Sequence, residues 1–269
     1  MRKRWTLSLA LGVIAVPALA QMGGDAAMRA ALAPTGTLRA AFLATNPVQA
    51  RVDPDSGEIT GIVPDLAHEL ASRMDVDVAM NPIRGVPGVI EALRSGAADI
   101  GFLAYDPTRA EQVDFAQVYV LGHNSYLVRA DSPIRTLEDA DREGVRIGAR
   151  EAVAVDLFLS RTIEHAELVH LPRTTTDTDA ARMLLAGELD AYATNVQRLS
   201  AVTADEPRVR IVDGSLMSAD QAIVVAQGNE AGVAYLNRFL DDARSSGLLQ
   251  RIVGRYGLAG VEVAPPNMH

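Results

Sequence analysis

The stretch LRSGAADIGFLAYDPTRAEQVDF, Leu93–Phe115, is the part of the sequence that says most about the fold. It begins at the end of a short helical pattern closed by Gly96, continues into the apolar run Ile100–Leu103 and turns at Asp106-Pro107. A short apolar run bounded by turn residues is typical of a buried strand. The stretch therefore predicts a helix, a buried strand and a turn that leads to Arg109.

The same alternation extends in both directions along the chain. Apolar residues recur every four positions from Ile62 to Met74, which predicts an amphipathic helix. Further helices are expected at Val86–Leu93, Val153–Ile163 and Ala180–Ala186, and strands at Leu38–Leu43, Val76–Met80, Ile100–Leu103, Val145–Ala149, Leu168–Leu171 and Ala191–Thr194. Two successive βαβαβ units predict an α/β protein of two lobes with a ligand site in the cleft between them.

The C-terminal part predicts two more helices, over Glu230–Ser246 and Leu248–Tyr256, and each needs a sheet to cover. We expect them to return to the first lobe, with chain crossings near Val120–Asn124 and Gly214–Gln221 that form a hinge. Lobe 1 is accordingly assigned to residues 34–121 and 218–260, lobe 2 to 122–217, and a tail to 261–269.

The N-terminus has the pattern of a cleavable export signal. Arg2, Lys3 and Arg4 precede an apolar run to Val16, and Ala18-Leu19-Ala20 suits signal peptidase. We assign residues 1–20 to a signal peptide and 21–33 to a leader. The protein is therefore expected to be exported to the periplasm of a Gram-negative-type cell and to be soluble there.

Composition excludes several classes of function. The chain has no cysteine, so a disulfide framework and thiolate metal sites are excluded. Its net charge of −9 would fall to −12 without the three basic residues of the signal, which argues against a nucleic-acid partner. The five histidines lack metal-ligand spacing, and no phosphate loop stands out, so no metal or cofactor is expected.

A family resemblance is carried by several motifs in order. They are Gly57–Gly61 leading into Asp65-Leu66-Ala67, Leu93–Gly96, the strand from Asp99, Arg109, Val113-Asp114-Phe115, Leu184–Ala191 and Gly247-Leu248. Each motif is weak alone, but their order and spacing resemble the family 3 extracellular solute-binding proteins of ABC-type polar amino-acid uptake systems. The resemblance covers nearly the whole chain after the signal.

The resemblance implies the type II periplasmic-binding-protein fold, with two parallel-rich sheets joined by a two-strand hinge that closes over the ligand. It further implies a monomer that delivers a small anionic or zwitterionic ligand to an inner-membrane ABC permease. The family's matching arginine pairs with the ligand carboxylate, so Arg109 is the expected clamp. The alternative from the residues alone is a surface arginine paired with Asp106 or Asp114.

Several site positions depart from the family pattern. Ala104 and Tyr105 stand where hydroxyl or small residues are usual, leaving their main-chain N–H groups, and the Tyr105 ring, as candidate contacts. Asn195 replaces the acid that accepts from the ligand ammonium, with a structural cap or turn as its other reading. Asn46 replaces a stacking aromatic.

The lobe 2 part of the site has a similar departure. Val153 replaces a hydroxyl at a helix N-terminus, where main-chain donors and the helix dipole favour an anion, and Arg150 is a second candidate cation. Asp106 is included in the candidate site beside Arg109. Together these residues favour a carboxylate-bearing or amino-acid-like solute, and a non-enzymatic binding role. A periplasmic cyclohexadienyl or arogenate dehydratase-like enzyme, and a ligand-binding accessory or sensor protein, stay open as alternatives.

Overall fold

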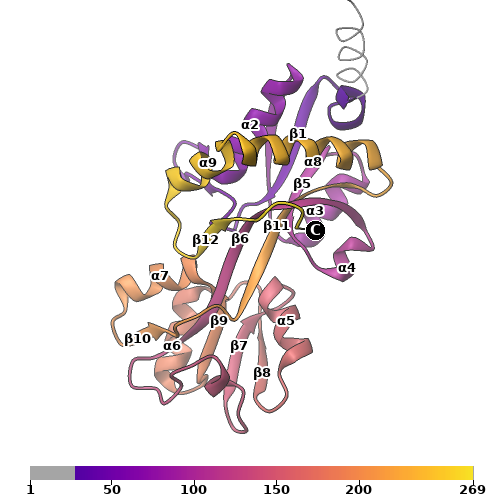
Figure 1. Ribbon diagram of the computed structural model, residues 1–269. Helices are drawn as coiled ribbons and strands as arrows, with labels where there is room; N and C mark the ends of the chain where they lie inside the picture. Colours follow the sequence, from indigo (N-terminus) through magenta and orange to yellow (C-terminus); the bar gives the residue numbers. More distant parts are fainter. Residues whose placement is uncertain (1–27, 269) are drawn as a thin grey trace, which may run out of the picture.

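The computed structural model describes residues 28–268, which form two lobes connected by two long strands (Figure 1). The expected signal peptide and residues 21–27 of the expected leader lie outside the described residues. The elements of the first lobe are β1 (Thr37–Leu43), β2 (Arg51–Val52), β3 (Ile59–Thr60), α2 (Ile62–Met74), β4 (Asp77–Ile83), α3 (Val86–Arg94), β5 (Ile100–Ala104), α4 (Pro107–Ala110), α8 (Glu230–Ser245), α9 (Leu248–Tyr256) and β12 (Val261–Val263).

The second lobe lies between the two long strands in sequence. The long strands are β6 (Val113–Arg129) and β11 (Met217–Ala226). Between them follow the 3-10 helix η1 (Glu138–Ala140), β7 (Arg146–Arg150), α5 (Ala154–Thr162), β8 (Glu167–Leu171), α6 (Asp177–Ala186), β9 (Ala191–Asn195), α7 (Val196–Asp205) and β10 (Val209–Ile211).

The hinge is the antiparallel pair of β6 and β11. Val120 pairs with Gln221 and Asn124 with Met217, so the two expected crossings lie side by side. The strand order is β4-β1-β5-β11-β6-β9-β7-β8, with β10 and β12 also paired to β6. Strands β4-β1-β5 in lobe 1 are parallel to one another, and so are strands β9-β7-β8 in lobe 2. The hinge strands connect these two parts into one continuous hydrogen-bonded sheet.

Helices cover both faces of the sheet in each lobe, which explains why a central strand such as β5 is apolar and buried along its whole length. In lobe 1 the largest core packs α2, α8 and α9 onto β1 and β5, and a second core packs α3 onto the other face. Lobe 2 likewise has one core beneath α5 and another beneath α6 and α7. Each lobe therefore has its own buried interior, and the surface between them is left for a cleft.

Helix α2 illustrates how the sequence produces these elements. Ile62, Leu66, Leu70 and Met74 are fully buried on one side, as their spacing predicts. The helix starts after Gly61, whose φ is 144°, and an added Cβ there would lie 2.6 Å from the Cα of Ala50. Glycine is required at this position because the backbone of the preceding loop passes against it.

The predicted helices and strands are confirmed, and most differ from the observed bounds by one to three residues. Helix α6 starts at Asp177, before the predicted Ala180, because Thr176 and Asp179 form a capping box. The elements that were not expected are helices α4 and α7, the 3-10 helix η1 and strands β2, β3, β10 and β12. Strand β12 adds the start of the expected tail to β6, and Leu32 and Ala33 of the expected leader are buried in the lobe 1 core. The lobe boundaries themselves stay a prediction.

Candidate functional site

A cleft of about 1150 Å³ lies between the lobes, with the hinge strands as its floor. It is lined by lobe 1 residues Leu43, Thr45, Asn46, Arg84, Ala104 and Arg109, by hinge residues Gly122, Asn124, Ala219 and Gln221, and by lobe 2 residues including Arg150, Val153, Arg173, Asp177, Thr194, Asn195 and Arg198. Eight arginines and four carboxylates line the cleft of a chain whose net charge is −9. The local charge therefore favours an anion although the whole protein is acidic.

Arg109 lies on the lobe 1 side of this cleft with only 5% of its surface exposed. Its Nη1 donates to the carbonyl oxygen of Ala104 at 2.8 Å, and its Nη2 donates across the cleft to the carbonyl oxygen of Ala152 at 3.3 Å. Among residues 28–268 no carboxylate lies within ion-pair distance of it. The alternative of a surface arginine in an ion pair with Asp106 or Asp114 is therefore wrong.

Burial lowers the pKa of Arg109, and the negative charge of nearby Asp106 partly offsets that effect. An arginine remains protonated under such conditions. The site therefore contains a desolvated positive charge that is held by two backbone carbonyls and lacks a direct counter-ion in the described chain. An anion in the cleft would supply that counter-ion.

Asp106 is buried but serves the structure around the site. Its Oδ1 accepts from the amide nitrogen of Thr108 at 2.9 Å, which caps α4, and its Oδ2 accepts from Arg161 of lobe 2 at 3.2 Å. Burial alone would raise the pKa of Asp106, but the Thr108 and Arg161 hydrogen bonds outweigh it and leave the pKa lowered. Asp106 does not line the cleft. The structure thus places it as a helix cap and an ion pair between lobes, away from the expected ligand contact.

Of the two neighbours Ala104 and Tyr105, only Ala104 lines the cleft. Ala104 lines the cleft at the end of β5, with its carbonyl oxygen already bonded to Arg109. Tyr105 lies outside it, because its amide nitrogen donates to the backbone carbonyl oxygen of Asp220 at 2.8 Å and its ring packs edge-on against Phe115. Neither the main-chain N–H nor the ring of Tyr105 is placed to contact a ligand.

The N-terminus of α5 faces the cleft through Val153, which offers no side-chain cap. The preceding Ala152 adopts a left-handed φ of 56°, and its carbonyl is the oxygen that Arg109 contacts. Asp156 in the first turn accepts from the amide nitrogen of Ala152 at 2.9 Å. A carboxylate of the chain itself therefore already occupies part of the positive end of this helix, which weakens its attraction for a ligand anion.

Asn195 and Asn46 line the cleft, and both use their side-chain oxygen locally. Asn195 Oδ1 accepts from the amide nitrogen of Arg198 at 2.9 Å and caps α7, so the reading of Asn195 as a structural cap is correct. Asn46 Oδ1 accepts from the amide nitrogen of Val48 at 3.1 Å within a turn. Their amide nitrogens remain as the groups to offer a ligand, and these are donors.

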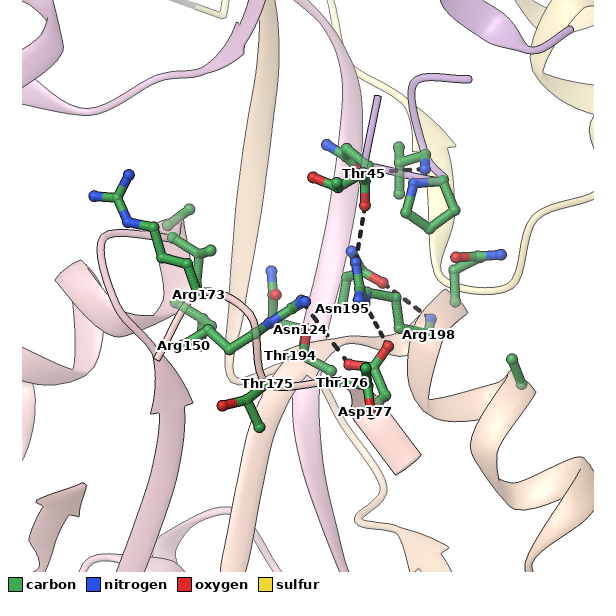
Figure 2. A pocket seen from close by; sticks show the side chains of 18 of the residues that line it. Thr45, Asn124, Arg150, Arg173, Thr175, Thr176, Asp177, Thr194, Asn195 and Arg198 are labelled. Carbon is green, nitrogen blue, oxygen red and sulfur yellow. Dashed lines mark hydrogen bonds and ion pairs between the residues drawn. The ribbon is translucent and has the colours of Figure 1, made fainter. Parts of the chain in front are cut away.

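Lobe 2 contributes a cluster of charged side chains that the sequence did not single out, apart from Arg150 (Figure 2). Arg198 Nε donates to Asp177 Oδ2 at 2.8 Å, and Arg198 Nη1 reaches across to the carbonyl oxygen of Thr45 at 2.9 Å. Arg150 Nη2 lies 3.9 Å from Asp177 Oδ1. Arg198 lies in the first turn of α7, a helix that was not predicted, and nothing in its local pattern indicates that it would contact lobe 1.

The hinge strands at the floor of the cleft contribute polar side chains. These residues lie in the expected crossings, but the sequence did not indicate them as functional. Asn124 and Gln221 line the cleft while nearly fully buried, at 4% and 3% exposure. Gln49 lies beneath them and donates to Gln221 Oε1 at 3.1 Å. Asn124 and Gln221 are polar residues within segments that were expected to cross between the lobes. Their polarity at such a position is the signal from which the sequence could have indicated them.

Residues 38–259 match the bacterial extracellular solute-binding proteins, family 3. The chain belongs to this family. A glutamine-binding protein of Geobacillus stearothermophilus is 26% identical over 165 residues, which cover 60% of this chain and 62% of that relative, somewhat less than two thirds of its length. The L-cystine-binding protein of Escherichia coli strain K12 is 22% identical over 207 residues, or 74% of each protein.

Solved structures show the fold of type II periplasmic binding proteins and so confirm the predicted fold class. A binding component of an ABC transporter from Wolinella succinogenes, complexed with lysine, has a TM-score of 0.69 at 23% identity and covers 82% of this chain and 95% of its own. A histidine kinase sensor domain has the same TM-score at 22% identity, covering 85% and 98%. The fold is thus common to members of transport systems and to a sensor.

The described chain has two further properties that bear on function. From residue 28 to residue 268, no helix is both long and apolar enough to cross a membrane. No group of three or more histidine or acidic side chains in the same part of the chain is arranged to hold a metal ion.

Proposed function

We propose that this member of the family is an exported periplasmic protein that closes over a small carboxylate-bearing solute and delivers it to an ABC permease. The observation that carries the proposal is Arg109, a guanidinium with 5% exposure that faces the cleft and has backbone carbonyls as its hydrogen-bond partners. A buried cation without a direct counter-ion is costly in the absence of ligand, and a carboxylate that forms a bidentate pair with it offsets that cost.

The contact between Arg109 and Ala152 also suggests how binding is coupled to closure. Arg109 belongs to lobe 1 and Ala152 to lobe 2, so a ligand held by Arg109 lies where both lobes meet. An anion at this point contacts both sides in the closed form and one side in the open form. The ligand therefore binds the closed form more tightly, which is the condition for ligand-driven closure.

The ammonium half of an amino-acid site is not supported by the geometry. Asn195 supplies a neutral amide whose oxygen already caps α7. Hydrogen bonds to charged groups are roughly twice as strong as neutral ones, so this position attracts an ammonium far less than an acid would. The proposal is accordingly for a carboxylate as the required group of the ligand.

The test is calorimetry on the purified protein with a panel of amino acids, dicarboxylates, quaternary amines and aromatic acids, guided by mass spectrometry of any solute released when the protein is unfolded. Arg109→Met should weaken binding of the solute so identified by about 2–5 kcal/mol. Arg94→Met, which removes an exposed lobe 1 arginine outside the cleft, should bind like wild type. If Arg109→Met folds and binds that solute as wild type does, the clamp is wrong.

Delivery to a permease needs its own check. A permease and an ATPase encoded beside this gene would support import, whereas a neighbouring kinase would support sensing. Incubation of the protein with prephenate or arogenate, followed by product analysis, tests the dehydratase alternative directly, and measurable turnover would replace the proposed binding role.

A further inference from the structure

Arg150 is a second guanidinium in the cleft whose bonding is incomplete. It ends β7 in lobe 2, and its side chain is 12% exposed. Its Nε is buried without a hydrogen-bond partner, and its closest charged contact is Asp177 at 3.9 Å, beyond hydrogen-bond distance. Within the described chain the Arg150 guanidinium thus forms no hydrogen bond, which is unusual for a buried group with five donors.

Asp177 does not neutralise this charge, because it is shared. Its Oδ2 accepts from Arg198 Nε at 2.8 Å and its Oδ1 accepts from the Tyr192 hydroxyl at 2.9 Å. Figure 2 shows Arg150 and Arg198 converging on this one carboxylate. One negative charge between two guanidinium groups leaves a net positive charge on the lobe 2 side of the cleft.

The other carboxylates that line the cleft leave this imbalance in place. Glu206 pairs with Arg208 at 2.6 Å, and Glu151 and Asp205 are exposed. No lining carboxylate among residues 28–268 is therefore both buried and free of an arginine. Among the described lining residues the cleft therefore offers two largely buried, under-compensated cations, one in each lobe, and no buried anion for a ligand ammonium.

We propose that the natural ligand is a dicarboxylate without an ammonium group, with one carboxylate on Arg109 and the second on Arg150. This inference rests on the proposed carboxylate-binding function and specifies its substrate class. The two guanidinium groups belong to different lobes, and a dianion gives each of them a carboxylate as counter-ion, so both charges act to hold the lobes closed. An amino acid with a neutral side chain leaves Arg150 with only its share of Asp177 and brings an ammonium into a cationic cleft.

The experiment compares matched probes by calorimetry on the intact protein. The dicarboxylates malonate, succinate, glutarate and adipate are each paired with the monocarboxylate of equal carbon number, namely propionate, butyrate, valerate and hexanoate. Aspartate and glutamate serve as the α-amino counterparts of succinate and glutarate. The best dicarboxylate should bind at least about tenfold more tightly than its monocarboxylate partner and than its α-amino counterpart where the panel holds one.

Variants assign the preference to Arg150. Arg150→Gln should bind the dicarboxylate and the monocarboxylate with equal affinity, and Arg150→Lys should keep part of the preference because it keeps the charge. Arg129→Gln removes an exposed arginine of the same lobe outside the cleft and should keep the full preference. Thermal unfolding of each variant establishes that the comparison is made on folded protein.

The two proposals fail in different ways. If all dicarboxylates bind no more tightly than their monocarboxylate partners while Arg109→Met still abolishes binding, the dicarboxylate inference is overturned and the clamp stands. The same result is expected if a single carboxylate of the ligand contacts both Arg109 and Arg150. If the folded Arg150→Gln protein keeps the full preference for the dicarboxylate, Arg150 is not the second contact and the inference is likewise overturned. If Arg109→Met leaves binding intact, the proposed function fails first.

Discussion

Two arginines reach across the cleft in opposite directions, and they differ in what balances their charge. Arg109 of lobe 1 contacts the carbonyl oxygen of Ala152 in lobe 2, and Arg198 of lobe 2 contacts the carbonyl oxygen of Thr45 in lobe 1. Arg198 also has a carboxylate partner in Asp177 at 2.8 Å, whereas Arg109 is the more deeply buried and no carboxylate in the described residues pairs with it.

The difference separates a cation with a structural ion pair from the cation that we propose to bind the ligand. A partly buried ion pair such as Arg198–Asp177 is complete in the folded protein, so a ligand gains little by approaching it. An under-compensated guanidinium costs free energy until an anion arrives, and the ligand recovers that cost on binding. Burial and the missing partner, more than the residue type, are the grounds on which we propose Arg109 as the binding group.

The largest expected effect on stability separates the two arginines. Asp177→Asn removes the charge partner of Arg198, whose side chain is 16% exposed, and should lower the free energy of unfolding by about 1.5–3 kcal/mol. Arg109→Met, in contrast, should leave the stability of the ligand-free protein unchanged or raised, because it removes a buried charge that lacks a direct partner. Urea denaturation without ligand measures both. Equal losses in the two variants would contradict the distinction.

A smaller effect concerns the buried acid between the lobes. Asp106→Asn keeps the cap of α4, because asparagine is an equally good cap, but loses the ion pair with Arg161. Since Arg161 is half-exposed, the expected loss is about 0.5–1 kcal/mol at neutral pH. Urea denaturation of both proteins at neutral pH measures this difference.

The same pair of proteins gives a pH test with a definite sign. The folded-state pKa of Asp106 is lowered, so its ionised form stabilises the protein fully above the ordinary aspartate pKa. That stabilisation is lost as the pH falls through the lowered folded-state pKa, and the asparagine variant lacks this titration. The stability difference between wild type and Asp106→Asn should therefore shrink on acidification. A difference that is constant with pH would show that the charge of Asp106 is not what stabilises this contact.

The smallest expected effect is on the shape of the ligand-free protein. Arg161→Gln removes one of the contacts that join the lobes and should shift the equilibrium slightly toward an open form. Small-angle X-ray scattering should then give a slightly larger radius of gyration, which returns to the wild-type value when saturating ligand is added. A radius unaffected by this substitution would mean that Asp106–Arg161 does not contribute to closure.

The sequence was sufficient for the architecture, because the signals for it are local. The four-residue spacing from Ile62 to Met74 determines which side of α2 is buried, and short apolar runs determine the strands. The repeated alternation of these elements predicted two lobes with crossings that the structure places side by side in β6 and β11. The family resemblance in the sequence also supplied the cationic candidates, Arg109 and Arg150, because the motifs that contain them are visible without the fold.

The tertiary structure decided which of these groups are free to act. The amide nitrogen of Tyr105 donates to the backbone carbonyl oxygen of Asp220 in β11, and Asp106 is paired with Arg161 in lobe 2. These partners are between 55 and 115 residues away in the sequence, and no local pattern encodes such pairs. The free or occupied state of a donor depends on packing between distant segments. For that reason the sequence alone could propose Arg109 as a clamp, whereas the folded chain shows that Arg109 and Arg150 remain without a full counter-ion.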